Sequence, residues 1–451
     1  MRLVPRREYI ILLAGDILVF VVALWLTLFF RHFTFPVPEV FLQHLLPFSL
    51  LFVVWVAIFF LAGLYGKHTR LFRSRLPAAI FYTQVINVII AALFFFFVPI
   101  FGIAPKTILV LYLLISFVLI FWWRVGLVPT SRAVRRLEGI LIASGADAQA
   151  LAEEIASDAR YPFSFSYVVD TKNSPSHEVI RQACGMVGEE KVNFLVADFS
   201  DKAVAAALPI VYDAAFNKPR FAFVDAADLY QEVFDRVPLS LITYQWVLES
   251  IGSSRAYDFL KRIIDIFFAF IVGIISLIAY PFVALAIKLD DGGPIFITQE
   301  RIGRFQRKIR IIKFRSMSGN DEGNYGKKGH SALAVTRVGK WLRLLRIDEL
   351  PQIWNVLSGD LSLVGPRPEL PKLASQYSAR IPYYNARHLV SPGLSGWAQV
   401  KHDQHPHHGA DMVETKTKLS YDLYYLKHRS LLLDIYIILQ TVKIIFTARG
   451  S

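Results

Sequence analysis

Residues 336–369, TRVGKWLRLLRIDELPQIWNVLSGDLSLVGPRPE, decide what the C-terminal part of this chain is. Within this stretch, Arg343, Arg346 and Arg367 lie on either side of two adjacent acids, Asp348 and Glu349. An unperturbed aspartate, with a pKa of about 3.9, is ionised at neutral pH and needs no separate base to act as a nucleophile. Arginine binds phosphoryl groups through paired hydrogen bonds and offsets their charge, and glutamate is a natural oxygen ligand for Mg²⁺. The pattern therefore predicts phosphoryl transfer, with Asp348 as the nucleophile and Glu349 as the metal ligand.

A purely structural interpretation of the same residues stays open on spacing alone. Asp348 suits the N-cap of a helix, Glu349 is favoured in the first turn by the helix dipole, and Pro351 is tolerated there. The arginines would then form a solvated or lipid-facing basic surface.

Three consecutive motifs carry a resemblance that favours the catalytic interpretation. They are R-x-G-x-x-L-R, then D-E-L-P-Q-x-x-N-V-L-x-G-D-x-S, then V-G-P-R-P-E. Together they resemble the signature of the bacterial sugar transferase family, the polyprenyl-phosphate hexose-1-phosphate transferases or monotopic phosphoglycosyl transferases. The resemblance covers residues 255–451, whereas the earlier residues match only the architecture of the family's long members, which have four N-terminal transmembrane helices.

The composition indicates a multidomain membrane protein. The chain has 451 residues, of which 54% are hydrophobic, and there is room for two or three domains. The net charge is +13, and many of the basic residues lie beside apolar runs. This placement favours anionic lipid and phosphate-bearing substrates as partners over nucleic acid. Cys184 is the single cysteine, so an intrachain disulfide and a cysteine metal site are excluded.

Four apolar runs within residues 1–130 predict four transmembrane helices, at roughly 9–30, 43–65, 78–101 and 107–123. Each approaches or exceeds the ~20 residues that cross a bilayer. Basic residues gather before the first run, between the second and third, and after the fourth: Arg2, Arg6, Arg7, Lys67, Arg70, Arg73, Arg75, Arg124, Arg132, Arg135 and Arg136. The positive-inside rule then predicts a cytoplasmic N-terminus and a cytoplasmic segment after the fourth run. Asp16, inside the first run, is expected to reach the headgroups or to pair with another helix.

Residues 137–250 predict a Rossmann-like α/β domain with a parallel sheet, because short apolar runs alternate with helical stretches, one of them starting at about residue 177. The dinucleotide fingerprint is degenerate: Gly145 is one glycine where three are expected, although Asp170 lies about where a ribose-binding acid would. We expect a scaffold for dimerisation or regulation, with nucleotide binding as the alternative.

A fifth apolar run, within residues 255–290, predicts a re-entrant membrane helix. Basic residues flank it on both sides, so both of its ends are expected on the same side of the membrane. Pro281 removes a backbone donor at a cost of ~3 kcal/mol or more in a straight helix, which predicts a helix–break–helix at that residue. The resemblance implies the same element, usually with a serine where this chain has Tyr280, and the K-R-x-x-D opening matches Lys261, Arg262 and Asp265.

Residues 291–451 are expected to form a cytoplasmic, mostly helical α/β catalytic domain. The segment GGPIFITQERIGRFQRKIRIIKFRSM predicts two strands around a basic turn and resembles the family's G-P-x-F-x-Q-x-R-x-G…K-F-R-S-M. Lys313 and Arg315 alternate with apolar residues, so both are expected to face an anionic ligand, unless they only protect an edge strand. Residues 319–332 predict a loop over the site. The last apolar run, LLLDIYIILQTVKIIF, predicts a helix that lies in the interface or packs on the re-entrant segment.

Four histidines near the end of the chain, His402, His405, His407 and His408, raise the question of a metal site. Their spacing fits neither a helical pair nor a zinc-finger pattern, and no cysteine joins them. A polar loop is the preferred interpretation.

The resemblance implies a UDP-sugar donor, an undecaprenyl phosphate acceptor and a Mg²⁺ cofactor. In this scheme Asp348 attacks the sugar-bearing phosphate, UMP leaves, and the lipid phosphate takes the hexose-1-phosphate from the covalent adduct. This would be the first membrane step of O-antigen, capsule or exopolysaccharide synthesis, on the cytoplasmic face of the bacterial inner membrane. Glucose or galactose is the expected sugar, and a homodimer is the expected assembly.

The resemblance also distributes roles among the motif residues. Arg343 and Arg367 match the phosphate-binding arginines, and Lys313 and Arg315 are expected to add to that site. Supporting positions are Arg346, Gln352, Asn355 and Asp360.

Two other functions stay as alternatives. A nucleotide-sugar oxidoreductase or dehydratase would use the middle domain, and the Tyr257-x-x-x-Lys261 pair fits the tyrosine and lysine of short-chain dehydrogenases. A non-enzymatic regulator of polysaccharide assembly would tolerate neutralisation of the arginines and acids. Neither alternative accounts for the motifs of residues 336–369.

Overall fold

The computed structural model describes most of the chain, in these ranges: 8–65, 76–98, 106–127, 136–158, 161, 163–172, 192–202, 204–207, 209, 212, 222–250, 252, 254–319, 333–402 and 411–446. They form two compact units, which are treated separately: Arg2–Leu137 with Asp158–Pro162, and Glu138–Ser157 with Phe163–Ser451. Several features discussed above lie outside the described residues: Cys184, the helix expected from about residue 177, the basic loop 66–75, most of the loop 319–332, and His405, His407 and His408.

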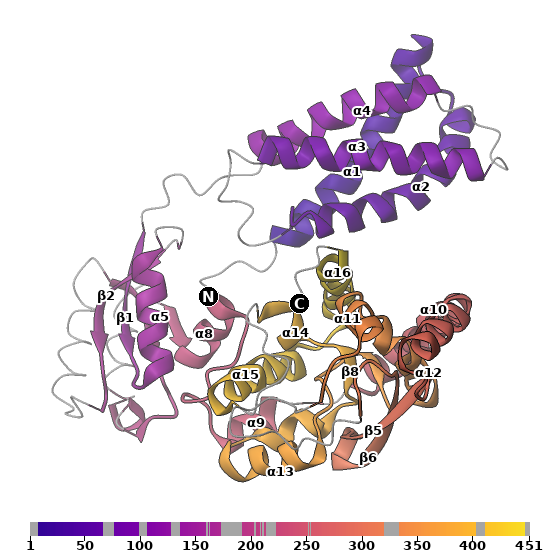
Figure 1. Ribbon diagram of the computed structural model, residues 1–451. Coiled ribbons are helices and arrows are strands. Elements are labelled where there is room, and N and C mark those ends of the chain that lie inside the picture. Colours follow the sequence, from indigo (N-terminus) through magenta and orange to yellow (C-terminus); the bar gives the residue numbers. More distant parts are fainter. Residues whose placement is uncertain are drawn as a thin grey trace. The chain divides into compact units, whose positions relative to one another are not determined.

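The described part of the first unit consists of apolar helices, as the sequence predicts. They are α1 (Glu8–His32), α2 (Pro38–Leu61), α3 (Leu76–Phe97) and α4 (Lys106–Phe121), with a π-helical turn at Trp122–Leu127 (Figure 1). The first three are long and apolar enough to cross a membrane, and Ile108–Arg124 is a shorter apolar helix. Aromatic side chains make the core between them, with Phe20, Phe48, Trp55 and Tyr112 fully buried. The four apolar N-terminal helices of the prediction are therefore confirmed.

A buried ion pair ties the two ends of this helical unit together. The guanidinium of Arg124 donates through Nη2 and Nε to the Asp16 carboxylate, and its Nη1 donates to Leu64 O at 2.7 Å. The Tyr65 hydroxyl donates to Asp16 Oδ2 at 2.6 Å. Asp16 thus pairs with another helix, which is one of the two placements expected from the sequence. Arg124, counted above among the flanking charges, is instead a buried structural partner.

We expect Asp16→Asn to destabilise the helical unit by ~3–5 kcal/mol, because removing one partner leaves the other charge buried without compensation. Thermal unfolding of the full chain in detergent measures the loss. Asp16→Leu combined with Arg124→Leu is the control, since an apolar pair of similar volume should restore most of the stability. Equal loss in the single and double variants would contradict this role.

The middle region is a parallel α/β layer, as predicted. Its elements are β1 (Leu137–Ile142), α5 (Ala146–Ser157), β2 (Phe163–Val169), β3 (Val192–Ala197), β4 (Ala222–Asp225) and α8 (Ala226–Phe234). The strand order is β2-β1-β3-β4, and the pairs β1–β3 and β3–β4 are parallel. In such sheets ligands bind where the strand order reverses, here at the carboxyl ends of β1 and β3.

Ser240 of the same chain occupies this position at the carboxyl end of β1. Gly145, with φ of +97°, leads from β1 into α5, and the N-terminus of α5 is where a dinucleotide phosphate would bind. Ser240 sits there, donating from its backbone N and its Oγ to Asp147 Oδ2 at 3.0 and 2.7 Å. This arrangement favours the scaffold over nucleotide binding.

The segment that follows α8, which includes Asp235, Val237 and Ser240, also joins the middle region to the C-terminal domain. Both belong to one compact unit. Asp235 accepts from Trp397 Nε1 at 2.7 Å through its backbone oxygen and pairs with Lys401 Nζ at 3.0 Å. Val237 N donates to Ser420 O at 3.0 Å. After α9 (Tyr244–Ser250) the chain enters the membrane-associated helix.

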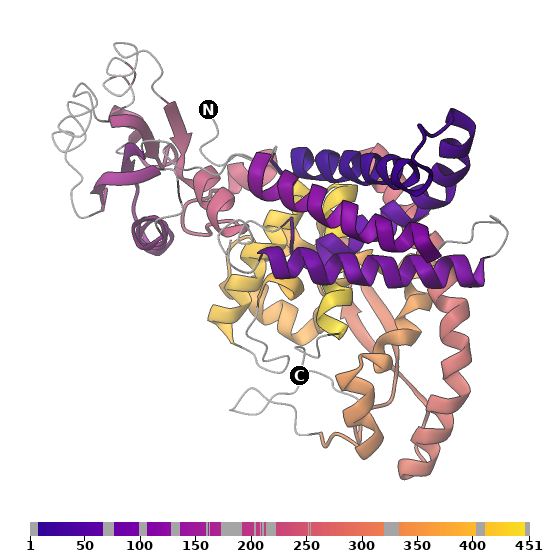
Figure 2. The same ribbon diagram turned by 90° about the horizontal axis from the view of Figure 1, so that it is seen from above.

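Helix α10 spans Arg255–Asp291, 37 residues, and Figure 2 shows it in salmon as one long helix. The break expected at Pro281 is wrong, because helical conformation continues through that residue. A proline removes one hydrogen bond, and a helix that is packed on both sides of it can absorb the loss without ending. Tyr280 and Val283, on either side of Pro281, both pack on the cluster around Phe314.

The C-terminal domain carries the remaining elements, in the colours from salmon to yellow (Figure 1). They are β5 (Phe296–Ile302), η3 (Arg304–Gln306), β6 (Lys308–Phe314), α11 (Arg337–Leu344), η4 (Ile347–Gln352), α12 (Ile353–Ser358), β7 (Ser362–Val364), α13 (Pro371–Arg380), η5 (Tyr384–Leu389), β8 (Gly393–Ser395), α14 (Trp397–Lys401), α15 (Met412–His428) and α16 (Leu431–Phe446). Strands β5 and β6 form the predicted antiparallel hairpin around a basic turn.

Candidate active site

The acid pair is presented by a sharp turn between two short helices. Helix α11 begins at the Thr336 N-cap, whose side chain accepts from Gly339 N, and ends at Leu344. Arg346 then adopts φ of +53°, in the left-handed region, and directs the chain into η4. Because Arg346 is the N-cap of η4, the interpretation of Asp348 as a helix N-cap is wrong.

Glu349 is held by two cations from other parts of the fold. Its Oε1 lies 3.0 Å from Arg367 Nη2 and 3.7 Å from Lys313 Nζ. Lys313 belongs to β6 and Arg367 follows β7, so the contacts join three segments that are distant in sequence. We call Lys313, Arg346, Asp348, Glu349 and Arg367 the acid–base cluster. Among the described residues, no hydrogen bond or ion pair engages the carboxylate of Asp348, although it is adjacent to Glu349.

Charge and burial separate the pKa values of the two acids. Burial and the negative charge of Glu349 raise the pKa of Asp348 to about 6, against the effect of the nearby cations. Burial also opposes ionisation of Glu349, but Arg367, Lys313 and Arg346 outweigh it and hold the pKa of Glu349 well below its usual range. Burial lowers the pKa of Lys313 to about 8, although Glu349 counteracts it. Glu349 is thus a fixed anion, and Asp348 titrates near neutrality.

The other predicted phosphate-binding residues are placed differently. Arg343 Nη1 contacts Met317 Sδ at 3.2 Å, and its charge lowers the pKa of Asp348, so it lies near the cluster. Arg315 pairs with Asp291, at the end of α10, instead of Glu349. The alternation that places Lys313 toward Glu349 does not extend to Arg315 because β6 ends at Phe314.

A small cavity adjoins the acid–base cluster and adds Arg301 to it. The lining residues include Arg301, Lys313, Gln352 and Arg367. Gln352 is buried, and its Nε2 has no hydrogen-bond partner among the described residues, so a donor is available in a cationic cavity. This combination suits an anion such as phosphate. Arg301 is not among the phosphate-binding residues expected from the sequence, although it stands in the Q-x-R-x-G motif that carries part of the family resemblance.

The two remaining supporting residues differ in their contacts. Asn355 accepts from Ile312 N at 3.0 Å and donates to Arg310 O at 2.8 Å, so it fastens α12 to β6. Asp360 contacts Ser358 Oγ at 3.0 Å, at the end of α12 and apart from the acid–base cluster.

We expect Asn355→Ala to lower the free energy of unfolding by about 1–3 kcal/mol, because the partners left in β6 lose their hydrogen bonds. Asp360→Ala is the control and should change stability far less, because the side chain of Asp360 bonds a neighbouring serine and no other described residue. Denaturant unfolding of the full chain in detergent compares the two. Equal stability in both variants would refute the fastening role.

Arg262 and Asp265 hold the membrane helix against this site. Arg262 donates to Val356 O at 2.6 Å and to Leu357 O at 2.8 Å, at the C-terminal end of α12. Asp265 accepts from Leu363 N at 3.2 Å. The K-R-x-x-D motif identified these positions, but no pattern in the sequence indicates that they bond backbone atoms about a hundred residues away.

The carboxylates of the acid pair are suitable ligands for a magnesium ion whose remaining ligands would be water and substrate phosphate oxygens. Among the described residues, no group of three or more His, Cys, Asp and Glu side chains converges on a metal site. Mg²⁺, however, commonly takes one or two carboxylates and completes its shell with water and substrate phosphate oxygens. Among the described residues, both ion pairs of Glu349 use Oε1, so Oε2 is the oxygen that would bind a cation.

Comparison with known proteins finds one family and several relatives. The family profile described as "Bacterial sugar transferase" matches residues 256–448. A UDP-N-acetylgalactosamine-undecaprenyl-phosphate N-acetylgalactosaminephosphotransferase of Aeromonas hydrophila is 45% identical over 207 residues, which are 45% of this chain and 48% of that protein. A UDP-glucose:undecaprenyl-phosphate glucose-1-phosphate transferase of Caulobacter vibrioides is 39% identical over 198 residues, 44% of this chain and 73% of that protein. An undecaprenyl-phosphate glucose phosphotransferase of Komagataeibacter xylinus is 42% identical over 166 residues, 36% of this chain and 31% of that protein.

Proposed function

Since this chain belongs to the bacterial sugar transferase family, we propose that it transfers a hexose-1-phosphate from a UDP-sugar to undecaprenyl phosphate. The products would be undecaprenyl-diphosphate-sugar and UMP. The names of the relatives support both substrates, and the matched part of the chain spans about half of the Aeromonas protein. The observation that carries the proposal is the acid–base cluster, in which Glu349 is fixed by cations while Asp348 is not.

The reaction proceeds in two displacements at one phosphorus atom. An oxygen of the Asp348 carboxylate attacks the sugar-bearing β-phosphorus, the bond from that phosphorus to the bridging oxygen breaks, and UMP leaves with the bridging oxygen. An acyl-phosphate sugar then remains on Asp348. An oxygen of the lipid phosphate attacks the same phosphorus, and the carboxylate leaves unchanged.

The surrounding cations stabilise the charge that moves during these steps. Lys313, Arg301 and Arg367 line the cavity beside the acids and can neutralise the phosphate oxygens. The buried Nε2 of Gln352 supplies a further donor there. Mg²⁺, held by Glu349 and by phosphate oxygens, would offset charge on the diphosphate.

The position of α10 supports a catalytic domain on one face of the membrane, which we propose is the cytoplasmic face of the inner membrane. A helix of this length is ~55 Å long, more than a bilayer needs. Yet Arg262, near its start, and Asp290, near its end, both bond the same domain, the latter by accepting from Val338 N at 2.9 Å. A single crossing would separate these contacts, and this supports our proposal that the chain enters and leaves on one side.

The competing oxidoreductase function loses its main support. Tyr257 and Lys261 both bond Asp434, at 2.8 and 3.1 Å, so they form a structural contact between α10 and α16. Glucose or galactose is our proposed sugar, although the relatives' names also include N-acetylgalactosamine. A homodimer is likewise proposed, supported by the resemblance to the family's long members.

Replacing the nucleophile tests the proposal directly. Asp348→Asn should abolish UMP release from UDP-sugars and the phospho-sugar adduct, because an amide cannot displace UMP at neutral pH. UMP is measured with and without undecaprenyl phosphate and Mg²⁺, and the adduct by mass spectrometry. Glu300→Gln, an exposed acid outside the cluster, should retain activity. Normal turnover by Asp348→Asn would refute the mechanism.

The activity should be highest between about pH 6 and pH 8. Protonation of Asp348 removes the nucleophile as the pH falls through about 6, and loss of the Lys313 charge weakens phosphate binding as the pH rises through about 8. The profile of kcat/KM reports these groups in the free enzyme.

Lys313→Met should move the acidic limb to higher pH, because the lysine charge lowers the pKa of Asp348, and should remove the alkaline limb. Lys308→Met, an exposed lysine in the same strand, should keep both limbs. An unchanged profile in Lys313→Met would show that these groups do not control the rate.

A further inference from the structure

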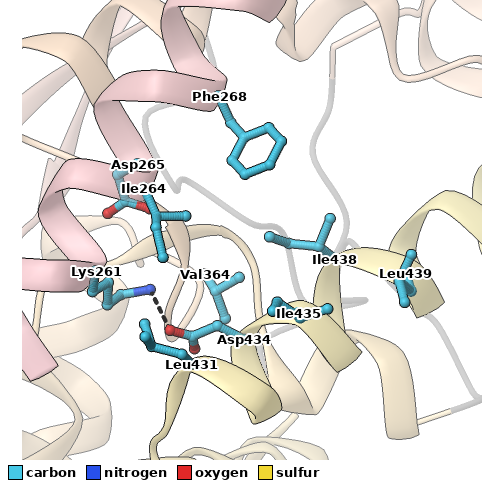
Figure 3. Close-up of a pocket in the computed structure, with 10 residues that line it drawn as sticks. All are labelled: Lys261, Ile264, Asp265, Phe268, Val364, Leu431, Asp434, Ile435, Ile438 and Leu439. Carbon is cyan, nitrogen blue, oxygen red and sulfur yellow. Dashed lines mark hydrogen bonds and ion pairs between the residues drawn. The ribbon is translucent and has the colours of Figure 1, made fainter. Parts of the chain in front are cut away.

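A second cavity lies between α10 and α16, and its walls are apolar. Figure 3 shows Ile264 and Phe268 on α10, Ile435 and Ile438 on α16, and Val364 of β7 around it. Phe268 and Ile435 are 47% and 49% exposed, so the cavity is open rather than sealed. A space of this kind recognises hydrocarbon rather than a sugar nucleotide.

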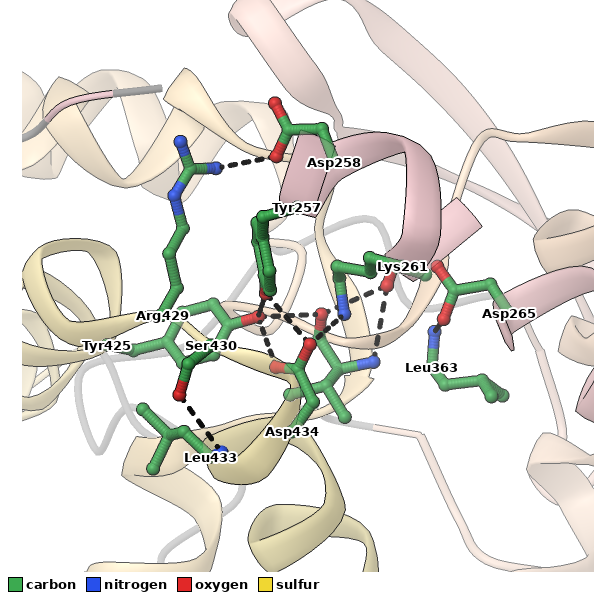
Figure 4. Close-up of polar contacts among 12 residues, drawn as sticks. Tyr257, Asp258, Lys261, Asp265, Leu363, Tyr425, Arg429, Ser430, Leu433 and Asp434 are labelled. Atoms are coloured by element: carbon green, nitrogen blue, oxygen red, sulfur yellow. Dashed lines mark hydrogen bonds and ion pairs between the residues drawn. The ribbon is translucent and has the colours of Figure 1, made fainter. Parts of the chain in front are cut away.

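The charged residues at one end of the cavity are already satisfied by one another. Asp434 accepts from Lys261 Nζ at 3.1 Å and from the hydroxyls of Tyr257 and Tyr425, each at 2.8 Å (Figure 4). Asp265 accepts from Leu363 N. The contacts of Asp434 connect α10 to α16 at that end, and Lys261, the cation that lines the cavity, is paired with Asp434 rather than left for an anionic headgroup.

Exposed apolar side chains cover α10 beyond the residues that line the cavity. Phe267, Phe270, Ile274 and Ile275 on this helix are all more than two-fifths exposed, although they are large and apolar. Exposed apolar surface of this extent belongs in hydrocarbon. A chain that enters from the bilayer therefore reaches the cavity without leaving an apolar environment.

The wall at β7 connects the cavity to the acid–base cluster. Val364 lines the cavity, and Arg367, which binds Glu349, follows three residues later. Three residues of extended chain span at most ~11 Å. An occupant of the cavity that also carries a phosphate can therefore place that phosphate beside Arg367. A phospholipid and a prenyl phosphate both meet this condition, but only the prenyl phosphate is the acceptor of the proposed reaction.

We propose that the cavity between α10 and α16 binds the isoprenoid tail of the prenyl-phosphate acceptor, and this rests on the proposed function. The tail binds by burial of its apolar surface, and its phosphate is thereby held near Asp348 for the second displacement. The cavity takes no part in the first displacement, because the sugar nucleotide has no hydrocarbon chain.

Filling the cavity tests this assignment. Ile438→Trp, and Ile435→Trp at a half-exposed position that tolerates a larger side chain, should each raise the KM for undecaprenyl phosphate about tenfold, because two or so buried methylene groups lose their contacts. The KM for geranyl phosphate, whose tail is too short to fill the cavity, should stay the same. Release of UMP from the UDP-sugar without acceptor should also be unchanged. All measurements use the full chain in nanodiscs.

Leu432→Trp is the matched control, because Leu432 lies on α16 but is 65% exposed and does not line the cavity. An unchanged KM for undecaprenyl phosphate in both cavity variants would overturn the proposal, as would an equal rise for geranyl phosphate. A photoreactive prenyl phosphate should label α10 or α16, and labelling by a photoreactive phospholipid that undecaprenyl phosphate fails to displace would assign the cavity to bilayer lipid instead. If the unaltered protein releases no UMP from any UDP-sugar, the proposed function itself fails, which is a distinct result.

Discussion

The ion pairs of Glu349 with Arg367 and Lys313 are the contacts on which the candidate site depends. They bring together β6, η4 and the segment after β7, which no local sequence preference would join. They also separate the two acids electrically: the cations keep Glu349 ionised, and its fixed charge then raises the pKa of Asp348. Neighbouring acids whose environments shift their pKa values in opposite directions are typical of residues with different catalytic roles.

The membrane helix contributes to this arrangement through backbone contacts. Arg262 binds the carbonyls at the end of α12, and α12 directly follows the η4 turn that presents the acids. Val356 O also accepts from Gly359 N at 3.2 Å, and a guanidinium is a suitable additional donor to carbonyls at the end of a helix. If α10 lies in the bilayer as proposed, these contacts fix the position of Asp348 relative to the membrane surface, as the proposed reaction between a soluble donor and a membrane-bound acceptor requires.

The sequence predicts much of this structure where the signal is local or belongs to a motif. The β5–β6 hairpin, the parallel sheet, the apolar helices and the closeness of Asp348 and Glu349 to arginines all follow from patterns of a few residues. The errors have a common cause in tertiary packing. Pro281 does not end α10, because contacts on both sides support the helix, and Arg315 does not join Lys313, because β6 ends one residue too early. The place of Arg301 and Gln352 beside the phosphate-binding residues follows only from the cavity that they line, which the sequence does not indicate.

The charged residues of the apolar helices show why composition alone cannot separate structural from functional groups. Asp16 pairs with Arg124, and Asp434 pairs with Lys261, so each buried carboxylate has its own cation and adds a fixed contact between helices. Asp348 differs in kind: among the described residues its carboxylate has no such partner, and the nearby cations bind its neighbour instead. An acid whose charge is left uncompensated in a cationic surrounding remains free to exchange a proton or to attack an electrophile, which a paired acid is not. The contrast within one chain therefore identifies position 348 more sharply than the abundance of acids and arginines in residues 336–369.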